Sequence, residues 1–356
     1  MARRPTIADL AAAAGVSQAT VDRVLNGRHA VRAETSHRVY AAAQAIGYHA
    51  VALIAHRMQP ELPVFTLGVL LQHPEQAFYR ALQNAIEIAA RDHAGARVKL
   101  IVEFLPSMLP GDIAARLLTL GARVQAVALT SVDHHHVTRA VAELTARGVP
   151  VIALLSDFAQ ASRQSYLGLD NLRVGRTAAW MIAHGTSGTM PGAAPRPTGK
   201  IGIFVGGLRW HGHELREIGL RSFIREYAPD LQVLDSLVSL DTTELTYEAT
   251  LALLARHDDL VGIYCAGGGM EGVIQAIREA GRSRDPGRRI EVVVNELTEV
   301  SRLALADGVI SLVIATPLRQ LATELISLWI AALSRPAINA PGQSFLPLEL
   351  HLPESV

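Results

Sequence analysis

Apolar stripes broken by turn residues predict three short helices in the first fifty residues. Thr6 can cap a helix that stops at Gly15, and Ser17 can cap the next. The apolar positions of this second helix fall on one face and are Val21, Val24 and Leu25. A third stripe, residues 33–46, ends at Gly47. Two helices joined by a tight glycine turn, followed by a third, predict a helix-turn-helix headpiece.

From Val64 onward, continuous apolar runs of strand length alternate with amphipathic segments of helix length. Runs that are apolar at every position are typical of parallel strands with helices on both faces. The predicted helices span residues 76–92, 134–147, 171–184, 211–227, 243–257 and 268–280. The pattern predicts an α/β protein, in which an N-terminal all-α headpiece precedes two doubly wound parallel-sheet lobes.

These elements divide the chain into a headpiece, a linker and a core. The expected bounds are 1–48 for the helix-turn-helix headpiece, 49–63 for the hinge or linker, and 64–356 for the core. Within the core, we expect the first lobe at about 64–165 and 317–340, and the second at about 166–316 and 341–356.

Composition excludes several classes of protein. The 356 residues are 49% hydrophobic and 19% charged, which argues against a disordered chain. The single cysteine, Cys265, cannot form an internal disulfide. The amino terminus lacks the apolar stretch of a secretory signal, and no apolar run approaches the ~20 residues of a membrane span. We therefore expect a soluble, cytoplasmic protein without membrane contact.

Charge is distributed unevenly along a chain that is neutral overall. Basic and acidic side chains number 33 each, but residues 1–60 hold seven arginines against three acids, a net charge of +4. Phosphate neutralisation supplies most non-specific DNA affinity, so a basic head on an acidic body is typical of DNA binding. A solvated, arginine-rich surface is the plainer alternative.

The polar face of the second helix carries side chains suited to DNA. Gln18 can bond adenine in two places and Arg23 can do the same with guanine. Ser17, Thr20 and Asn26 have the short polar reach used in phosphate contacts. Each residue alone fits a solvated helix face equally well, whereas the group together favours a recognition helix.

The segment TIADLAAAAGVSQATVDRVLNGRHAVRAETSHRVYAAAQAIGY resembles the headpiece of the lactose-repressor (LacI/GalR) family of bacterial transcription regulators. The most specific runs are AGVS at 14–17, RVLN at 23–26 and GY at 47–48. The resemblance implies that Gln18, Ala19 and Arg23 read bases. The full set of implied DNA contacts is Thr6, Ser17, Gln18, Ala19, Thr20, Asp22, Arg23, Asn26, His29 and Arg57.

Two departures from the family pattern affect this interface. Asp22 stands where the family usually has serine, and an acid there repels phosphate unless another group satisfies it. In the hinge, the family inserts a leucine into the minor groove, but the count from the conserved tyrosine places Arg57 at that position. The alternative wedges are Leu53, Ile54 and Met58.

In the core, polar and aromatic side chains follow the ends of several predicted strands. Ligands of doubly wound sheets gather at these carboxyl ends. The residues concerned are Gln72, His73, Phe78, Tyr79, Ser156, Asp157, the segments 209–216 and 266–269, Asn295 and Glu296. Aromatic rings pack against sugar C–H faces while acids, amides and guanidinium bind hydroxyls, so the set favours a polyol.

Residues 64–350 resemble the sugar-binding core of the same family, which shares its fold with type I periplasmic sugar-binding proteins. The marks are GLDN at 168–171, Gly175-Arg176, Arg216 with Gly219, and the Thr316-Pro317 pair. The resemblance implies that Arg216, Glu296, Phe78, Tyr79 and Asp157 bind ligand. The full set of implied effector contacts is Gln72, Phe78, Tyr79, Asp157, Asp170, His211, Arg216, Gly267, Gly268, Glu296 and Thr316.

One departure concerns the ligand itself. Relatives commonly have an Asn-Asp pair where this chain has Gly267 and Gly268. A glycine run exposes backbone N–H groups that suit an anion, which leaves a phosphorylated or acidic sugar open as the effector.

Other chemistry receives less support. The stretch 192–200 has the wrong spacing for a phosphate loop, and the G-x-S-x-G nucleophile motif is absent. The histidines at 134–136, 211 and 213 lack a zinc-enzyme spacing, so no metal is expected. They are interpreted as surface residues, with His211 and His213 as alternative residues of the ligand cleft. A sugar-processing enzyme with Glu296 and Asp157 as acid and base is the main rival, and an extracytoplasmic solute receptor is a third alternative.

Taken together, the sequence predicts a transcription regulator, a repressor by the family resemblance, and not an enzyme. We expect a homodimer on a pseudo-palindromic operator of double-stranded DNA. The expected effector is a sugar, cyclitol or sugar derivative bound between the lobes, and no cofactor is expected.

Overall fold

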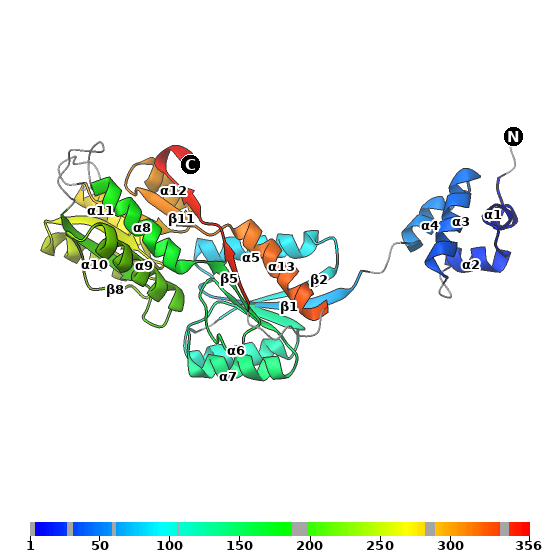
Figure 1. The fold of residues 1–356 in the computed structure, drawn as a ribbon, viewed down its shortest axis with the longest axis horizontal. Helices are drawn as coiled ribbons and strands as arrows, with labels where there is room; N and C mark the ends of the chain where they lie inside the picture. Colours follow the sequence, from blue (N-terminus) through cyan, green and yellow to red (C-terminus); the bar gives the residue numbers. More distant parts are fainter. Residues whose placement is uncertain are drawn as a thin grey trace. The chain divides into compact units, whose positions relative to one another are not determined.

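The chain folds into two compact units, Met1–Pro63 and Val64–Val356 (Figure 1). The computed structural model describes residues 4–26, 31–58, 62–105, 107–186, 198–281, 289–334 and 342–356. The first unit corresponds to the predicted headpiece and linker together, and the second to the predicted core.

The first unit contains four helices around a small apolar core. They are α1 (Ile7–Ala14), α2 (Gln18–Asn26), α3 (Ala33–Ala45) and α4 (Val51–Met58). Thr6 and Asp9 form a reciprocal capping box at the start of α1, and Gly15 adopts a left-handed φ of 64° where the helix ends. This turn directs Val21, Val24 and Leu25 of α2 into the core with Leu10 and Val39.

The segment predicted as a hinge is packed into the headpiece. Ile54 of α4 is fully buried in the same core as Leu10, Val21 and Val39, whereas its neighbour Leu53 is 46% exposed. The predicted boundary at residue 48 therefore does not separate two structural units, because the α4 side chain completes the headpiece core.

Six strands form a parallel sheet in the first lobe of the core, in the order β12-β5-β4-β3-β1-β2. They are β1 (Val64–Leu71), β2 (Arg97–Phe104), β3 (Ala126–Leu129), β4 (Val151–Leu154), β5 (Ser165–Leu169) and β12 (Gly342–Leu346). All pairings among them are parallel. Every residue of β3, β4 and β5 is buried, as the continuous apolar runs predict.

Helices cover both faces of this first sheet. α6 (Pro110–Gly121) and α7 (His135–Ala146) lie on one face, and α5 (Ala77–Asp92) and α13 (Leu318–Ser334) on the other (Figure 1). Leu67 and Val69 of β1 pack on the α5 and α13 side, while Leu70 packs with α6. Alternate residues of one strand thus fill two separate cores.

The second lobe repeats this plan around a sheet ordered β13-β11-β10-β9-β6-β7, with β8 also paired to β6. Its strands are β6 (Gly199–Val205), β7 (Leu231–Val233), β8 (Leu237–Val238), β9 (Leu260–Cys265), β10 (Glu291–Asn295), β11 (Leu312–Ala315) and β13 (Glu349–His351). Its helices are α8 (Asn171–Thr186), α9 (His211–Tyr227), α10 (Thr243–Arg256), α11 (Met270–Ala280) and α12 (Glu299–Ala306), with a final turn η1 (Pro353–Ser355). Only β13 among the described strands pairs antiparallel.

The chain passes between the lobes three times: from β5 to α8, from β11 to α13, and from β12 to β13. β5 and β12 both belong to the first sheet, where Gly342 pairs with Ser165. The predicted lobe bounds differ here, since they placed 166–169 and 342–346 in the second lobe. The backbone of β12 is held in the first lobe by Arg163, whose Nη1 donates to the Gly342 carbonyl at 2.8 Å.

The burial of Ile54 predicts a stability effect confined to the headpiece. Ile54→Ala should leave a cavity that destabilises this unit by about 2–5 kcal/mol, so amides of α1–α3 should exchange faster in hydrogen–deuterium exchange of the full chain. Leu53→Ala, the matched exposed control, should shift stability by less than about 0.5 kcal/mol. Equal effects of the two variants would contradict the packing of α4 on the headpiece.

Candidate functional site

The exposed face of α2 presents the residues predicted to read bases. Gln18, Ala19 and Arg23 are all exposed, while Val21 and Leu25 on the opposite face are buried. The buried face fixes the helix on the headpiece, so the three exposed side chains point into solvent. This arrangement leaves them free to enter a DNA groove.

Short polar residues around α2 form hydrogen bonds within the headpiece. The Thr20 backbone N–H donates to Ser17 Oγ at 3.2 Å, so Ser17 caps the helix as predicted from its position. Asn26 Nδ2 donates to Asp22 Oδ1 at 2.6 Å. Asp22, which stands where the family usually has serine, therefore accepts a hydrogen bond from an amide of its own helix.

The remaining predicted DNA contacts are only partly described. Thr6 caps α1, and its Oγ1 donates to Asp9 Oδ2 at 2.7 Å. His29 lies outside the described residues, as do the side chains of Arg57 and Met58. Of the alternative wedges, Ile54 is buried in the headpiece core and Leu53 is exposed.

A cavity of about 550 Å³ lies in the core unit, lined by residues of both lobes. Its walls come from the segments that follow β1, β4, β6, β8, β9 and β10, the strand ends at which doubly wound sheets bind ligands. The predicted effector residues that line it are Phe78, Tyr79, Arg216, Gly267, Gly268 and Glu296.

Arg216 is the buried cation of this cavity, with 8% exposure. Its Nε donates to Asn171 Oδ1 and its Nη1 to the Ala266 carbonyl, both at 2.7 Å. The position requires close packing of α8 on α9: a Cβ on Gly175 would stand 1.8 Å from the Arg216 carbonyl oxygen. Glycine at 175 thus allows the helices to approach and brings Arg216 beside Asn171.

Glu296 is held at the cavity wall by Thr316. The Thr316 backbone N–H donates to Oε2 at 3.0 Å and its hydroxyl donates to Oε1 at 2.7 Å. Burial raises the pKa of the Glu296 carboxyl above its usual 4.5, while the bonds from Thr316 and the charge of Arg216 act in the opposite direction. Thr316 itself, 4% exposed, supports Glu296 and is not among the described lining residues.

Four other predicted effector residues are likewise not among the described residues that line the cavity. Gln72 is buried, and its Nε2 donates to the Thr130 carbonyl at 2.6 Å. Asp157 forms a buried ion pair with Arg163, with 2.7 Å between Oδ2 and Nη2. Asp170 pairs with Arg173, and His211 with Glu214. Each of these polar groups has a partner within the protein, and its predicted role toward a ligand stays a prediction.

Asp241 lines the cavity but was not among the residues expected from the sequence, whereas His213 and Trp210 belong to the expected segment 209–216. The Gly268 N–H donates to Asp241 Oδ1 at 2.6 Å, and the Gly206 N–H donates to His213 Nδ1 at 3.1 Å. Burial lowers the pKa of His213 to about 4, so the imidazole is neutral at pH 7. Its second ring nitrogen then carries the proton.

Backbone strain is concentrated around the cavity. Among the described residues, six that are not glycine have a positive φ, and four of these line the cavity: His73, Leu155, Asp241 and Glu296. Such conformations cost roughly 1–3 kcal/mol each and persist where surrounding structure fixes them, often at binding sites. Asp241 and Glu296, the two acids among these four residues, are therefore held in place by the surrounding fold.

Two family models match the chain. The model of bacterial regulatory proteins of the lacI family matches residues 6–50, and the periplasmic binding protein domain matches residues 112–335. The chain is a lacI-family protein with a periplasmic binding protein domain. The first match covers α1–α3, and the second covers most of the core that holds the cavity.

Curated relatives are transcriptional regulators. The chain is 29% identical over 187 residues to an uncharacterized HTH-type regulator in the aml 5' region of Streptomyces limosus, covering 50% of this chain and 49% of that one. It is 38% identical over 88 residues to GalS of Salmonella typhimurium, 25% of each chain. MalR of Streptomyces coelicolor is 26% identical over 291 residues, 77% of this chain and 76% of MalR. The chain thus spans about half the length of the first relative and a quarter of the second.

Solved structures share the fold of the lacI-family core. A solute binding protein from Agrobacterium vitis with bound alpha-D-tagatopyranose has a TM-score of 0.70 at 19% identity, covering 82% of this chain and 95% of its own. A solute binding protein from Actinobacillus succinogenes with bound D-allose has the same TM-score at 18% identity, covering 82% and 98%. At this identity the likeness establishes the two-lobed fold alone.

The acid and base of the rival enzyme hypothesis are not assembled in the lacI-family core. Glu296 lines the cavity, but Asp157 is bound to Arg163 and is not among the described lining residues. A general acid and base must both reach the reacting group.

Among the described helices, none is long and apolar enough to cross a membrane.

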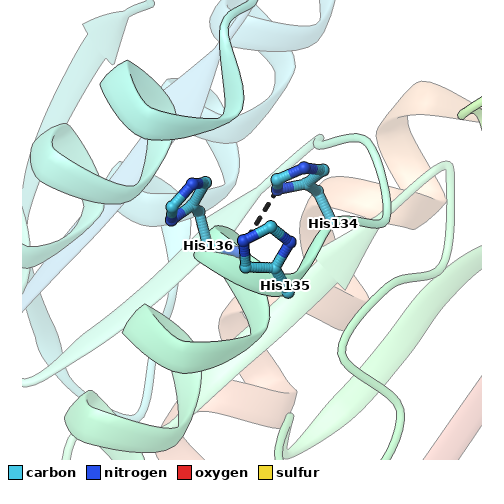
Figure 2. Close-up of side chains that lie close together, drawn as sticks. All are labelled: His134, His135 and His136. Carbon is cyan, nitrogen blue, oxygen red and sulfur yellow. Dashed lines mark hydrogen bonds between the residues drawn. The ribbon is translucent and has the colours of Figure 1, made fainter.

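Three consecutive histidines form a separate group at the start of α7 (Figure 2). Nitrogen atoms of His134, His135 and His136 lie within 4.8 Å of one another, and His134 Nδ1 accepts from the His136 backbone N–H at 3.2 Å. His135 and His136 are exposed, and the three are not among the described lining residues of the cavity. The group therefore plays no part in the cavity site.

The lowered pKa of His213 predicts an acid-sensitive core. In the folded protein His213 stays neutral down to about pH 4, whereas an unfolded histidine titrates near pH 6.5. The contribution of this difference to the free energy of unfolding is present above pH 6.5 and is lost as the pH falls toward 4. His213→Asn, which keeps an acceptor for Gly206, should remove about 1–3 kcal/mol of this pH dependence. Urea unfolding monitored by tryptophan fluorescence measures it.

The exposed His135→Asn variant is the control and should retain the wild-type pH dependence. An unchanged profile in His213→Asn would contradict a neutral, partly buried imidazole at this position.

Proposed function

We propose that this lacI-family protein is a sequence-specific DNA-binding transcription regulator whose operator affinity is set by a small polyhydroxylated ligand in the core cavity. The observation that carries the proposal is the exposure of Gln18 and Arg23 on a helix whose other face is buried. An exposed helix of this chemistry matches major-groove recognition, in which Gln reads adenine and Arg reads guanine.

The cavity supports the ligand part of the proposal. Arg216, Glu296, His213 and Asn295 supply donors and acceptors for hydroxyl groups, and Tyr79 and Trp210 supply aromatic surface. The two structural neighbours described above hold hexoses, which supports a sugar, cyclitol or related polyol here. A ligand that binds two lobes can bias their arrangement if it prefers one state.

Further parts of the proposal follow from DNA recognition. A homodimer would place two headpieces on a pseudo-palindromic operator, since a two-fold axis in the protein matches one in the site. The protein would act in the cytoplasm, where its DNA target lies, and would repress by occupying the operator. No catalytic step is part of this function.

Base reading by α2 predicts losses of affinity that depend on sequence. Arg23→Ala should weaken binding to the oligonucleotide that the wild-type full chain selects from a random pool by about 5- to 150-fold, equivalent to ~1–3 kcal/mol for one bidentate contact. Gln18→Ala should act similarly. Fluorescence anisotropy at fixed salt measures both.

Arg38→Ala is the matched control, because Arg38 is an exposed arginine of α3. It should lower affinity for selected and random DNA alike. The proposal fails if the wild-type chain selects no sequence, or if Arg38→Ala and Arg23→Ala lose selectivity equally.

Ligand binding in the cavity predicts the loss of a thermal shift. In a screen of sugars and cyclitols against the full chain, compounds that raise the melting temperature of the wild type should have no effect on Arg216→Ala, because its guanidinium organises the cavity wall. Arg225→Ala, an exposed arginine of the same helix, should retain the shift.

Arg216→Lys distinguishes a loss of ligand binding from a loss of folding. It keeps the positive charge but lacks the planar guanidinium that bonds Asn171 and Ala266 together. It should fold and show a reduced shift. An undiminished shift in both Arg216 variants would place the ligand elsewhere.

A further inference from the structure

Three glycines from two loops form a close-fitting socket around the carboxylate of Asp241. A Cβ on Gly206 would stand 2.1 Å from Asp241 Oδ1, and one on Gly267 would stand 2.6 Å from the same oxygen. A Cβ on Gly268 would stand 2.9 Å from Asp241 Cβ. These approaches are closer than real side-chain contacts, so the carboxylate fits only because these positions have no side chains.

The socket also binds the carboxylate. The Gly268 N–H donates to Asp241 Oδ1 at 2.6 Å, the short distance of a charge-assisted bond. Successive backbone N–H groups of a glycine run make a concave site for anions. The sequence left open an anionic effector bound by Gly267 and Gly268. In the structure, the carboxylate of Asp241 occupies this place.

The placement of Asp241 is fixed by its surroundings. Its backbone adopts a left-handed φ of 57°, its N–H donates to Ser239 Oγ at 3.2 Å, and its carbonyl accepts from Gln76 Nε2 at 3.3 Å. Ser239 is 1% exposed and is itself bonded to the Val205 carbonyl. The loop thus holds the carboxylate in the socket against backbone strain.

Negative charge dominates the cavity. Among the described lining residues, the acids are Glu75, Asp241, Glu244, Glu271 and Glu296, and Arg216 is the one arginine or lysine. Two donor groups of Arg216 are already taken by Asn171 and Ala266, and His213 is neutral at pH 7. An anionic ligand would lose its hydration here for little compensation.

A positive group would be favoured near Tyr79. Burial raises the pKa of the Tyr79 phenol, and the charges of Asp241 and Glu296 act in the same direction while Arg216 acts against them. A ligand that packs on this ring is therefore within the field of both carboxylates. Aromatic faces also attract cations, which adds to the same preference.

We propose that Asp241 is a built-in anion that occupies the glycine socket, so that the cavity excludes anionic metabolites and takes a polyol carrying an ammonium group. This inference rests on the proposed function only for the role of the cavity as the effector site. It names the class of effector and the residue that selects it.

Inorganic phosphate tests the occupied socket without knowledge of the effector. Calorimetric titration should detect no phosphate binding to the wild-type full chain, and binding should appear in Asp241→Gly, which tolerates the left-handed backbone and empties the socket. Asp241→Asn, which keeps the acceptor but removes the charge, should bind phosphate more weakly than Asp241→Gly. Asp235→Asn, an exposed acid between β7 and β8, is the control and should resemble the wild type.

Phosphate bound in the wild-type cavity would overturn the proposal. So would an Asp241→Gly variant that folds, by its circular dichroism, and still binds no phosphate. If that variant does not fold, a lack of any gain in Asp241→Asn overturns it.

Three small polyols of one shape test the preference for an ammonium group. Tris carries ammonium, pentaerythritol is neutral, and 2,2-bis(hydroxymethyl)propionate is anionic. Saturation-transfer NMR should give the strongest signal for Tris and the weakest for the propionate, and Asp241→Asn should reduce the signal for Tris by several-fold. Equal signals, a stronger signal for the propionate, or no signal from any of them would overturn the preference.

The two proposals fail in different ways. If the wild-type chain binds no DNA sequence selectively, the proposed regulator function is refuted, while the phosphate and polyol results are unaffected. Phosphate binding in the wild-type cavity would refute the role of Asp241 and leave the regulator standing.

Discussion

Arg216 carries a charge into the core at 8% exposure, and the geometry of the cavity depends on how that charge is satisfied. Its bonds tie the first residue of α8, Asn171, to the carbonyl that follows β9. A buried charge without partners costs several kcal/mol, so these segments and α9 must stay in register for the core to fold. Gly175 makes the arrangement possible, because only a residue without a side chain lets the two helices come this close.

Two acids of the cavity wall are also held by partners within the core. Glu296 is fixed by Thr316, Asp241 is fixed by the glycine socket, and both accept strained backbone conformations. The packing of the two sheets beneath the cavity offsets the free-energy cost of this strain and of burying the two carboxylates. A site with such fixed groups is organised before any ligand arrives, which lowers the entropy lost on binding.

Much of the fold could be predicted because local pattern and tertiary position agree. The continuous apolar runs mark the buried strands, and the predicted helix at 211–227 has the bounds of α9. The lobe boundaries were wrong near β12, whose residues alternate between half-buried and exposed up to the buried Leu346 and whose partner, β5, is far away in the sequence. Periodicity indicates that a segment is a strand but not which strand it pairs with.

The cavity residues that could be anticipated follow strands whose apolar run can be recognised in the sequence. Arg216, Glu296, Phe78 and Tyr79 were found in this way, whereas Asp241 follows the two-residue β8, which has no readable periodicity. The ion pair of Asp157 with Arg163 could not be anticipated either, because it can be recognised only in three dimensions.

In the proposed regulator, a cavity ligand and operator DNA bind the same molecule through linked equilibria. The most direct measurement is the dissociation constant of a cavity ligand for the full chain, free and saturated with operator DNA. Linkage requires the two values to differ, by about 5- to 150-fold for a coupling of ~1–3 kcal/mol. Identical values would contradict the account, because a ligand indifferent to bound DNA cannot control it.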